Sequence, residues 1–137
     1  MAVFNANGNS IFTLDDSGGT PRIMTPYVTE IDGLEKLYDI KDATHLSHTA
    51  AVPYAGIQMS FTLTVRGKHD ITALVGPHVV FPGIVGGNTT RTLVITLEGT
   101  STYTMEVLCT AYRTIIRNKE LIEYEAVLVS TGAITIA

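Results

Sequence analysis

A chain of 137 residues is long enough for one domain with its own hydrophobic core, without disulfides or a metal to hold it together. Charged residues make up 16% of the chain, against about 25% in an ordinary soluble domain, which favours a protein that hides much of its surface against neighbours. The net charge of -4 argues against a non-specific nucleic-acid-binding protein, which would normally be basic.

The first quarter of the chain predicts an N-terminal arm followed by a β-hairpin. Residues 1–10 have no periodicity, no basic region and no apolar run, so we expect a flexible arm and no signal peptide. Residues 11–14 predict a short strand, and residues 15–20 predict a turn made of residues that cap their own backbone or tolerate positive φ. The returning strand, 22–31, should be an edge or an irregular strand because prolines remove backbone donors there.

A long segment without sustained periodicity follows a predicted strand at 35–40. Residues 41–55 predict a loop, and a structureless connection of this length inside a compact domain is usually functional. Its small, adaptable residues indicate a loop that becomes ordered against a partner. His45 and His48 are spaced so that two imidazoles could reach one metal, but no third ligand completes the set. We therefore expect solvated histidines, with no metal and no cofactor.

The strongest β signal is the strict alternation of apolar and polar residues over 56–66. Successive side chains of a strand point to opposite faces, so one face needs a core and the other faces solvent, a lumen or a partner. Residues 71–76 then predict a short helix capped by Asp70, and residues 81–90 predict a Gly-rich connector that lacks the ending of a phosphate-binding loop.

The last third of the chain predicts a β-meander. Alternating stretches are separated by turn signals at 98–101 and 117–120; the stretches are 91–97, 103–111, 122–128 and 131–136. Cys109 lies in this pattern as a small buried hydrophobic residue, and a single thiol cannot form an internal disulfide. The expected fold class is mainly β: an antiparallel β-sandwich or barrel with one short flanking α-helix.

No catalytic group of residues stands out in the sequence. Paired carboxylates in an apolar setting, a Ser-His-acid order and a Cys-His pair are all missing, while Glu123 and Glu125 share one face of one strand, as on an ordinary solvated face. We therefore expect a protein that is not an enzyme.

Several short motifs keep a recognisable order and spacing from about Val28 onward. Residues 38–44 open the long loop with an acidic and aliphatic pattern, Tyr-Asp-Ile-Lys-Asp-Ala-Thr, and residues 52–56 close it with Val-Pro-Tyr-Ala-Gly. The later motifs are at 60–63, 70–76, 91–95, 103–105 and 129–135. Together they resemble the major tail proteins, or tail-tube proteins, of bacteriophages with long, non-contractile tails. The short helix and the Gly-rich loop after it depart from the family's pattern.

The resemblance implies one tail-tube domain over 1–137, whose copies form hexameric rings that stack into a tube. The inner sheets of six subunits would join into a barrel, and DNA would pass through its lumen without specific binding during ejection into the host. The implied partners are other copies of the chain and other tail proteins, such as the tape measure, tail tip and terminator, with no membrane. The implied location is the tail of the virion, assembled in the cytoplasm of the host bacterium.

The resemblance also suggests two groups of site residues. The inter-ring loop would act through Asp42, Thr44, His45, His48 and Tyr54, and the candidates for the lumen are Gln58, Thr62, Thr64, Glu123 and Glu125. Two alternatives stay open: the inner tube of a contractile injection or secretion system, and a soluble β-sandwich that binds carbohydrate. The second would need clustered aromatic residues, whereas tryptophan is absent and the six tyrosines are scattered.

Overall fold

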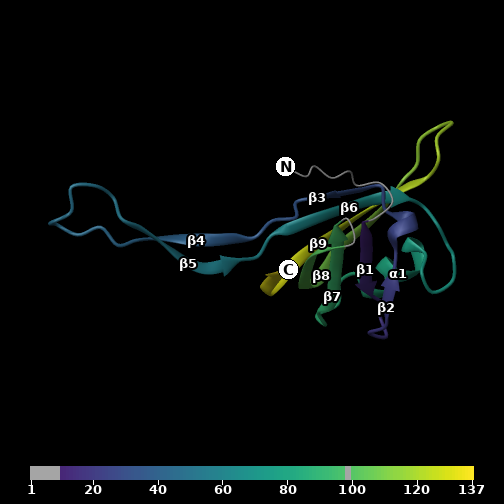
Figure 1. The fold of residues 1–137 in the computed structure, drawn as a ribbon. Helices are drawn as coiled ribbons and strands as arrows, with labels where there is room; N and C mark the ends of the chain where they lie inside the picture. The colour runs from purple at the N-terminus through teal and green to yellow at the C-terminus, as the bar shows by residue number, and fades with distance from the viewer. Residues whose placement is uncertain (1–9, 98–99) are drawn as a thin grey trace.

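The computed structural model describes residues 10–97 and 100–137, and within them the chain is mainly antiparallel β-sheet with one α-helix (Figure 1). A seven-stranded sheet has the order β2-β1-β7-β8-β9-β6-β3, and β4 and β5 form a separate two-stranded sheet. This confirms the predicted fold class. The elements are β1 (Ile11–Asp15), β2 (Pro21–Ile23), the 3-10 turn η1 (Thr25–Tyr27), β3 (Glu30–Asp32), β4 (Leu37–Asp42), β5 (Pro53–Met59), β6 (Thr62–Lys68), α1 (Pro77–Ile84), β7 (Arg91–Leu97), β8 (Ser101–Ile115) and β9 (Glu123–Ile136).

The hydrophobic core lies on one face of the seven-stranded sheet, where the alternating apolar residues of its strands are buried. The helix α1 covers this face and contributes Val80, Phe81 and Ile84, all fully or nearly fully buried. The rings of Phe81 and Tyr124 pack with centroids 5.5 Å apart. Burial of Cys109 in the same core, as predicted, raises the pKa of its thiol to about 11.

One glycine is required by close packing between β6 and η1. The Tyr124 hydroxyl donates a hydrogen bond of 2.8 Å to the carbonyl oxygen of Tyr27. A Cβ at Gly67 would clash with that carbonyl oxygen and would lie 2.9 Å from a ring carbon of Tyr124. Only glycine therefore allows η1 to sit against the sheet at this point.

The long alternating stretch 56–66 is not one strand, as the sequence predicted. The chain leaves the seven-stranded sheet at Ser60, so that its first half belongs to β5 and its second half to β6. The apolar residues of the second half, Phe61, Leu63 and Val65, are buried, whereas Ile57 is 76% exposed and Met59 44% exposed. The predicted loop over 41–55 is also shorter, because both of its ends pair with each other in the β4–β5 ladder.

The helix was predicted in the wrong place. Residues 71–76 form turns, because the Asp70 carboxylate accepts the backbone N–H and the hydroxyl of Thr72, which holds a local turn instead of capping a helix. The helix starts at Pro77, since proline is favoured at the first helical position, and it extends through Pro82 to Ile84. It therefore takes in the start of the predicted Gly-rich connector at 81–90.

Two further strand predictions need correction. The predicted strand 22–31 is divided into β2, η1 and β3, and its two strand pieces lie at opposite edges of the sheet. The separate strands predicted at 122–128 and 131–136 are one strand, β9, which continues through an irregularity at Gly132, where φ is 68°. The turn at 15–20 and the edge position of β2 are confirmed. The predicted N-terminal arm lies outside the described residues, apart from Ser10. No helix in the described ranges is long and apolar enough to cross a membrane.

Candidate functional site: a projecting hairpin and the polar face of the sheet

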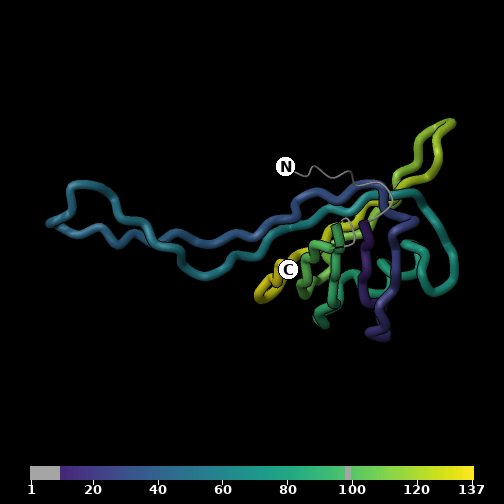
Figure 2. The backbone as a smooth tube through the Cα atoms, viewed as in Figure 1, coloured from purple at the N-terminus to yellow at the C-terminus, as the bar shows by residue number. Residues whose placement is uncertain are grey.

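The β4–β5 hairpin projects far from the body of the molecule (Figures 1 and 2). Its strands pair from Leu37 and Met59 at the base to Asp42 and Pro53 near the tip, with a register shift between Tyr38 and Ile40. The Ala43 N–H donates to the Val52 carbonyl at 2.9 Å and extends the ladder by one more bond. An isolated two-stranded hairpin is marginally stable at best in water, so this element lacks the support that the larger sheet has.

Apolar side chains are exposed along the whole hairpin. None of residues 37–59, all of which the structure describes, is buried. The large exposed side chains there are Leu37, Tyr38, Ile40, Leu46, Tyr54, Ile57 and Met59. Leu46, at the tip, is fully exposed, and Ile40 is 72% exposed. Runs of exposed apolar residues are typical of surfaces that interact with another molecule.

The predicted loop residues gather at the tip of the hairpin, apart from Tyr54. The Asp42 carboxylate accepts the Thr44 N–H at 2.9 Å, and hydrogen bonds from Thr44 hold the pKa of Asp42 below its ordinary value. The Thr44 hydroxyl in turn accepts the Val52 N–H at 2.8 Å. Tyr54 lies lower on the hairpin, on β5 opposite Lys41, and is 62% exposed.

The rings of His45 and His48 pack against each other at a tilt of 34°, with centroids 3.4 Å apart. The Nδ1 atom of His48 accepts the His45 N–H at 3.0 Å, so one imidazole is used to close the turn. The Ser47 hydroxyl lies 2.8 Å from Nδ1 of His45. In the part of the chain that the structure describes, no group of three His, Cys, Asp or Glu side chains is placed to hold a metal ion.

Four of the five lumen candidates share the polar face of the main sheet, opposite the core. Thr62 and Thr64 on β6 pair with Val129 and Val127 on β9, and the alternation places Glu123 and Glu125 on the same face of β9. Gln58 lies apart from them, on the hairpin, and its side chain bonds to the backbone of β9.

The two glutamates on this polar face are paired with cations. The Glu125 carboxylate lies 2.9 Å from the Arg66 guanidinium and 2.8 Å from that of Arg113, and the Glu123 carboxylate lies 2.7 Å from the Lys68 ammonium. Hydrogen bonds from Arg113 and Arg66 lower the pKa of Glu125, and the bond from Lys68 lowers that of Glu123. This part of the face is therefore close to neutral, although the chain as a whole is acidic.

The cations of this face were not among the site residues predicted from the sequence. Arg66 is the last polar residue of the alternating stretch 56–66, two residues after Thr64 and four after Thr62. The alternation could therefore have placed Arg66 on the same face as these threonines. Arg113 could not be placed in this way, because β8 has a register shift between Cys109 and Ala111.

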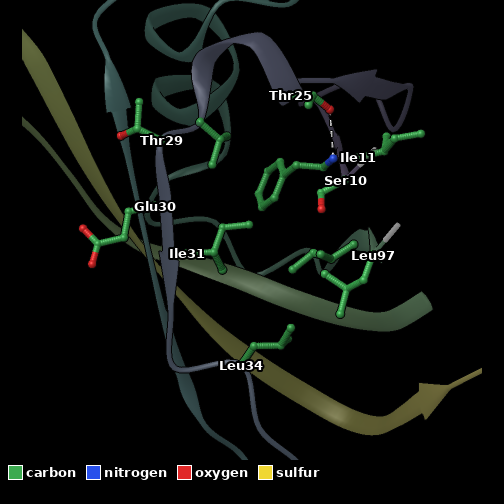
Figure 3. A pocket seen from close by; sticks show the side chains of 11 residues that line it. Ser10, Ile11, Thr25, Thr29, Glu30, Ile31, Leu34 and Leu97 are labelled. Atoms are coloured by element: carbon green, nitrogen blue, oxygen red, sulfur yellow. Dashed lines mark hydrogen bonds between the residues drawn. The ribbon is translucent and has the colours of Figure 1, made fainter. Parts of the chain in front are cut away.

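An apolar groove separates β3 from β1 and β7, near the two edges of the curled sheet (Figure 3). Its volume is about 620 Å³, and Ile11, Ile31, Leu34 and Leu97 are among its lining residues. The Phe12 N–H donates to the Thr25 hydroxyl at 3.0 Å at its border. Glu30 is the ionisable side chain among the lining residues, and it is paired with Arg66, so the groove offers no acid–base pair for catalysis.

Comparison with solved structures identifies the fold. The chain is similar to a chain in the virion of a native gene transfer agent, with a TM-score of 0.74 and 11% identity over 98% of this chain and 99% of that one. It is also similar to a chain of the sheath–tube complex of an extracellular contractile injection system (TM-score 0.68, 14% identity, 94% and 88% covered). A third similar chain comes from the baseplate of the anti-feeding prophage (TM-score 0.71, 9% identity, 100% and 97% covered). No family model and no curated protein matches the sequence.

These similarities extend over nearly the whole chain, so the complete fold is shared and not only one sheet. At 9–14% identity they show the fold alone.

Proposed function

We propose that the protein is the structural subunit of a tail tube, and that copies of it assemble with one another and with other tail proteins. The observation that carries the proposal is the β4–β5 hairpin, which projects with its apolar side chains exposed and without a core of its own. The shared fold with chains of a gene transfer agent virion and of a sheath–tube complex supports this role.

The hairpin makes the contact between successive rings in this proposal. A projecting element on one copy must be received by a different surface of the next copy, which is a heterologous contact. Heterologous contacts that do not close into a ring produce an open filament. The tip residues around Thr44, His45 and His48, together with exposed Leu46, would then lie against the neighbouring ring.

The polar face of the main sheet would line the lumen. Six copies in each ring would place Thr62, Thr64, Glu123 and Glu125 around a channel through which DNA passes on its way into the host. Because the two glutamates are already paired with Arg66, Arg113 and Lys68, the face offers few unpaired cations to bind phosphates. Phosphate contacts from free cations supply most non-specific affinity for DNA, so a neutralised face lets DNA slide past.

The tube role requires no chemistry from the chain. We therefore propose that the protein is a non-enzymatic component of a virion tail, assembled in the host bacterial cytoplasm. Its other partners would be a tape measure, a tail tip and a terminator. The bacteriophage would have a long, non-contractile tail.

A second candidate is the inner tube of a contractile injection system. The observation that favours it is the similarity to a chain of the sheath–tube complex of such a system. A sheath protein that binds the outside of the assembled tube in a pull-down with preformed tubes would support this candidate over the first.

Electron microscopy of the concentrated protein tests the tube proposal. We expect hollow tubes or stacked rings from the wild-type chain, with tail-tip complex added as an initiator where needed. In the test variant, residues 43–52 are replaced by Asn-Gly, a two-residue turn that keeps the β4–β5 ladder but removes the tip. In the control variant, the exposed turn 117–120 is replaced in the same way.

The tip variant should keep the wild-type melting temperature and remain as small particles, while the control variant should still form tubes. Small particles from the wild-type chain even with the tip complex present, or tubes from the tip variant, would refute the proposal.

A further inference from the structure

The hairpin leaves the main sheet at a point where β9 loses its neighbour. The β6–β9 ladder ends at the pair Thr62 and Val129. Beyond it, β9 continues to Ile136, paired with β8 on its other side. Among the described residues, no strand pairs with this last part of β9 on the side where β6 ends.

Gln58 bonds to this open stretch of β9 with both ends of its side-chain amide. Its Nε2 donates to the carbonyl oxygen of Gly132 at 3.3 Å, and its Oε1 accepts the N–H of Ile134 at 3.3 Å. A residue of a parallel neighbouring strand would use these same two backbone groups. The side chain therefore stands in for a peptide group at the edge of the sheet.

The backbone of β9 is shaped for this contact. The register between β8 and β9 shifts between Thr104 and Glu106, opposite Thr131 to Thr135, and Gly132 has a φ of 68°. An irregularity of this kind turns backbone groups away from the regular ladder and makes them available to another partner.

A second connection holds the chain on the other side of Ser60. The Phe61 N–H donates to the hydroxyl of Ser130 at 2.9 Å, and the Ser130 N–H donates to the Phe61 carbonyl at 3.0 Å. Ser130 is the one polar residue among the buried residues described, at 2% exposed, and Phe61 itself is 4% exposed. Phe61 is thus a fixed pivot, and Gln58 bonds to the sheet on the hairpin side of it.

We propose that Gln58 is a positioning residue that fixes the direction in which the β4–β5 hairpin leaves the sheet, through its two bonds to Gly132 and Ile134. This inference rests on the proposed function, because the direction of the hairpin decides where its tip meets the next copy. The seven residues of β5 span about 20 Å, so a rotation of about 10° at Ser60 would move the far end of β5 by about 3–4 Å, and the tip beyond it by more. Such a displacement would remove the tip from a complementary surface.

The direction of the hairpin can be measured on the unassembled protein. Spin labels at Thr49→Cys on the tip and Thr110→Cys on β8, in a Cys109→Ala background, give a distance distribution by double electron–electron resonance. We expect one narrow distribution for the parent protein. Gln58→Leu, which can neither donate nor accept, should widen it about two-fold. Ser60→Ala, at the exposed hinge, is the matched control and should leave it unchanged.

Gln58→Glu supplies a rescue by protonation. An ionised carboxylate accepts from Ile134 but cannot donate to Gly132, whereas a protonated carboxyl group can do both. The distribution of this variant should be wide near pH 7 and narrow again below the ordinary glutamate pKa of 4.5, with the parent protein unchanged across the same range. A general loss of stability would not produce this recovery. Should Gln58→Leu fail to fold, the pH comparison decides alone.

An unchanged distribution in Gln58→Leu, or a Gln58→Glu distribution that ignores pH, would overturn the inference. In a separate measurement, Gln58→Leu should raise the concentration needed for assembly about ten-fold, because the hairpin of the variant must be ordered when the copies bind one another. A wide distribution together with unchanged assembly would support the positioning role of Gln58 and refute the use of the hairpin in the tube.

Discussion

Removing the apolar character of the hairpin, without changing its shape, should weaken assembly and leave the fold of the subunit intact. Ile40 is 72% exposed and Ile57 is 76% exposed. Full burial of an isoleucine side chain stabilises a contact by about 1.5–3 kcal/mol. Covering the exposed three quarters of each side chain would therefore contribute about 1–2 kcal/mol to the free energy of assembly. For both side chains the contribution to a contact is about 2–4 kcal/mol, which corresponds to about 30- to 700-fold in an equilibrium constant.

The test compares Ile40→Thr, Ile57→Thr with Ile40→Val, Ile57→Val. Threonine and valine have nearly the same shape and both favour strands, so the two double variants differ mainly in one hydroxyl for one methyl group at each site. The threonine pair should raise the critical concentration for assembly by at least about 30-fold, and the valine pair by no more than about ten-fold. Sedimentation over a range of protein concentrations measures this value.

Both double variants should melt within a few degrees of the wild-type protein, because the substituted side chains are exposed in the free subunit. Assembly of the threonine pair at the wild-type critical concentration would refute the reasoning, since the exposed residues would then not be covered in the assembly. An equal rise of the critical concentration in both double variants would also count against the reasoning, because the hydroxyl group would then have no specific effect.

Three further predictions concern the subunit itself. Gly67→Ala should lower the free energy of unfolding by about 2–4 kcal/mol in urea titrations, because the added Cβ displaces Tyr27 and its hydrogen bond. Glu125 has a lowered pKa in the folded state, so its ion pairs stabilise the protein above its ordinary pKa of 4.5 and this contribution is lost as the pH falls through the folded value. Glu125→Gln should therefore flatten the dependence of the free energy of unfolding on pH as the pH falls below about 4.5. Leu74 has a φ of 72°, which is unfavourable for leucine, and Leu74→Gly should raise the free energy of unfolding by about 0.5–1 kcal/mol in the same titrations.

Local signals in the sequence predicted the elements that local interactions determine. The turn at 15–20 follows from Asp16, whose carboxylate accepts the N–H groups of Gly18 and Thr20. The alternation of β7, β8 and β9 follows from burial of one face of each strand in the core. These features depend on residues close together in the chain or on period alone, so the sequence is sufficient for them.

The break at Ser60 could not be predicted in this way. No proline or glycine interrupts the stretch between Ile57 and Val65, and the apolar alternation runs through the break without a change. What divides the strand is the hydrogen bonding of Phe61 to Ser130, a contact across 69 residues. The helix was misplaced for a similar reason, since Asp70 and Pro77 are both acceptable start signals and the packing of Phe81 against Tyr124 favours the second.

For the candidate site, the positions of the polar residues were partly predictable from the sequence, whereas the neutralisation of their charges was not. Alternation alone places Thr62 with Thr64 on one face of β6 and Glu123 with Glu125 on one face of β9. The pairing of β6 with β9 then brings the two pairs onto one face of the sheet. The neutralisation of that face depends on Arg113, which reaches Glu125 from β8, and on the pairing register, which the sequence does not specify. The charge of a single strand was therefore a poor guide to the charge of the face.

The apolar residues of the alternating stretch 56–66 differ in burial between β5 and β6, and this difference bears on assembly. In β6 the apolar residues, such as Leu63, are buried by the rest of the chain, and in β5 the equivalent residue Ile57 is exposed to solvent. A period-2 pattern reflects one covered face, and it does so whichever chain supplies the cover. The described residues of this chain cover β6 and not β5, and in the proposed assembly the cover of β5 comes from another molecule. A second copy meets this requirement most simply, since each copy would then both offer a hairpin and receive one.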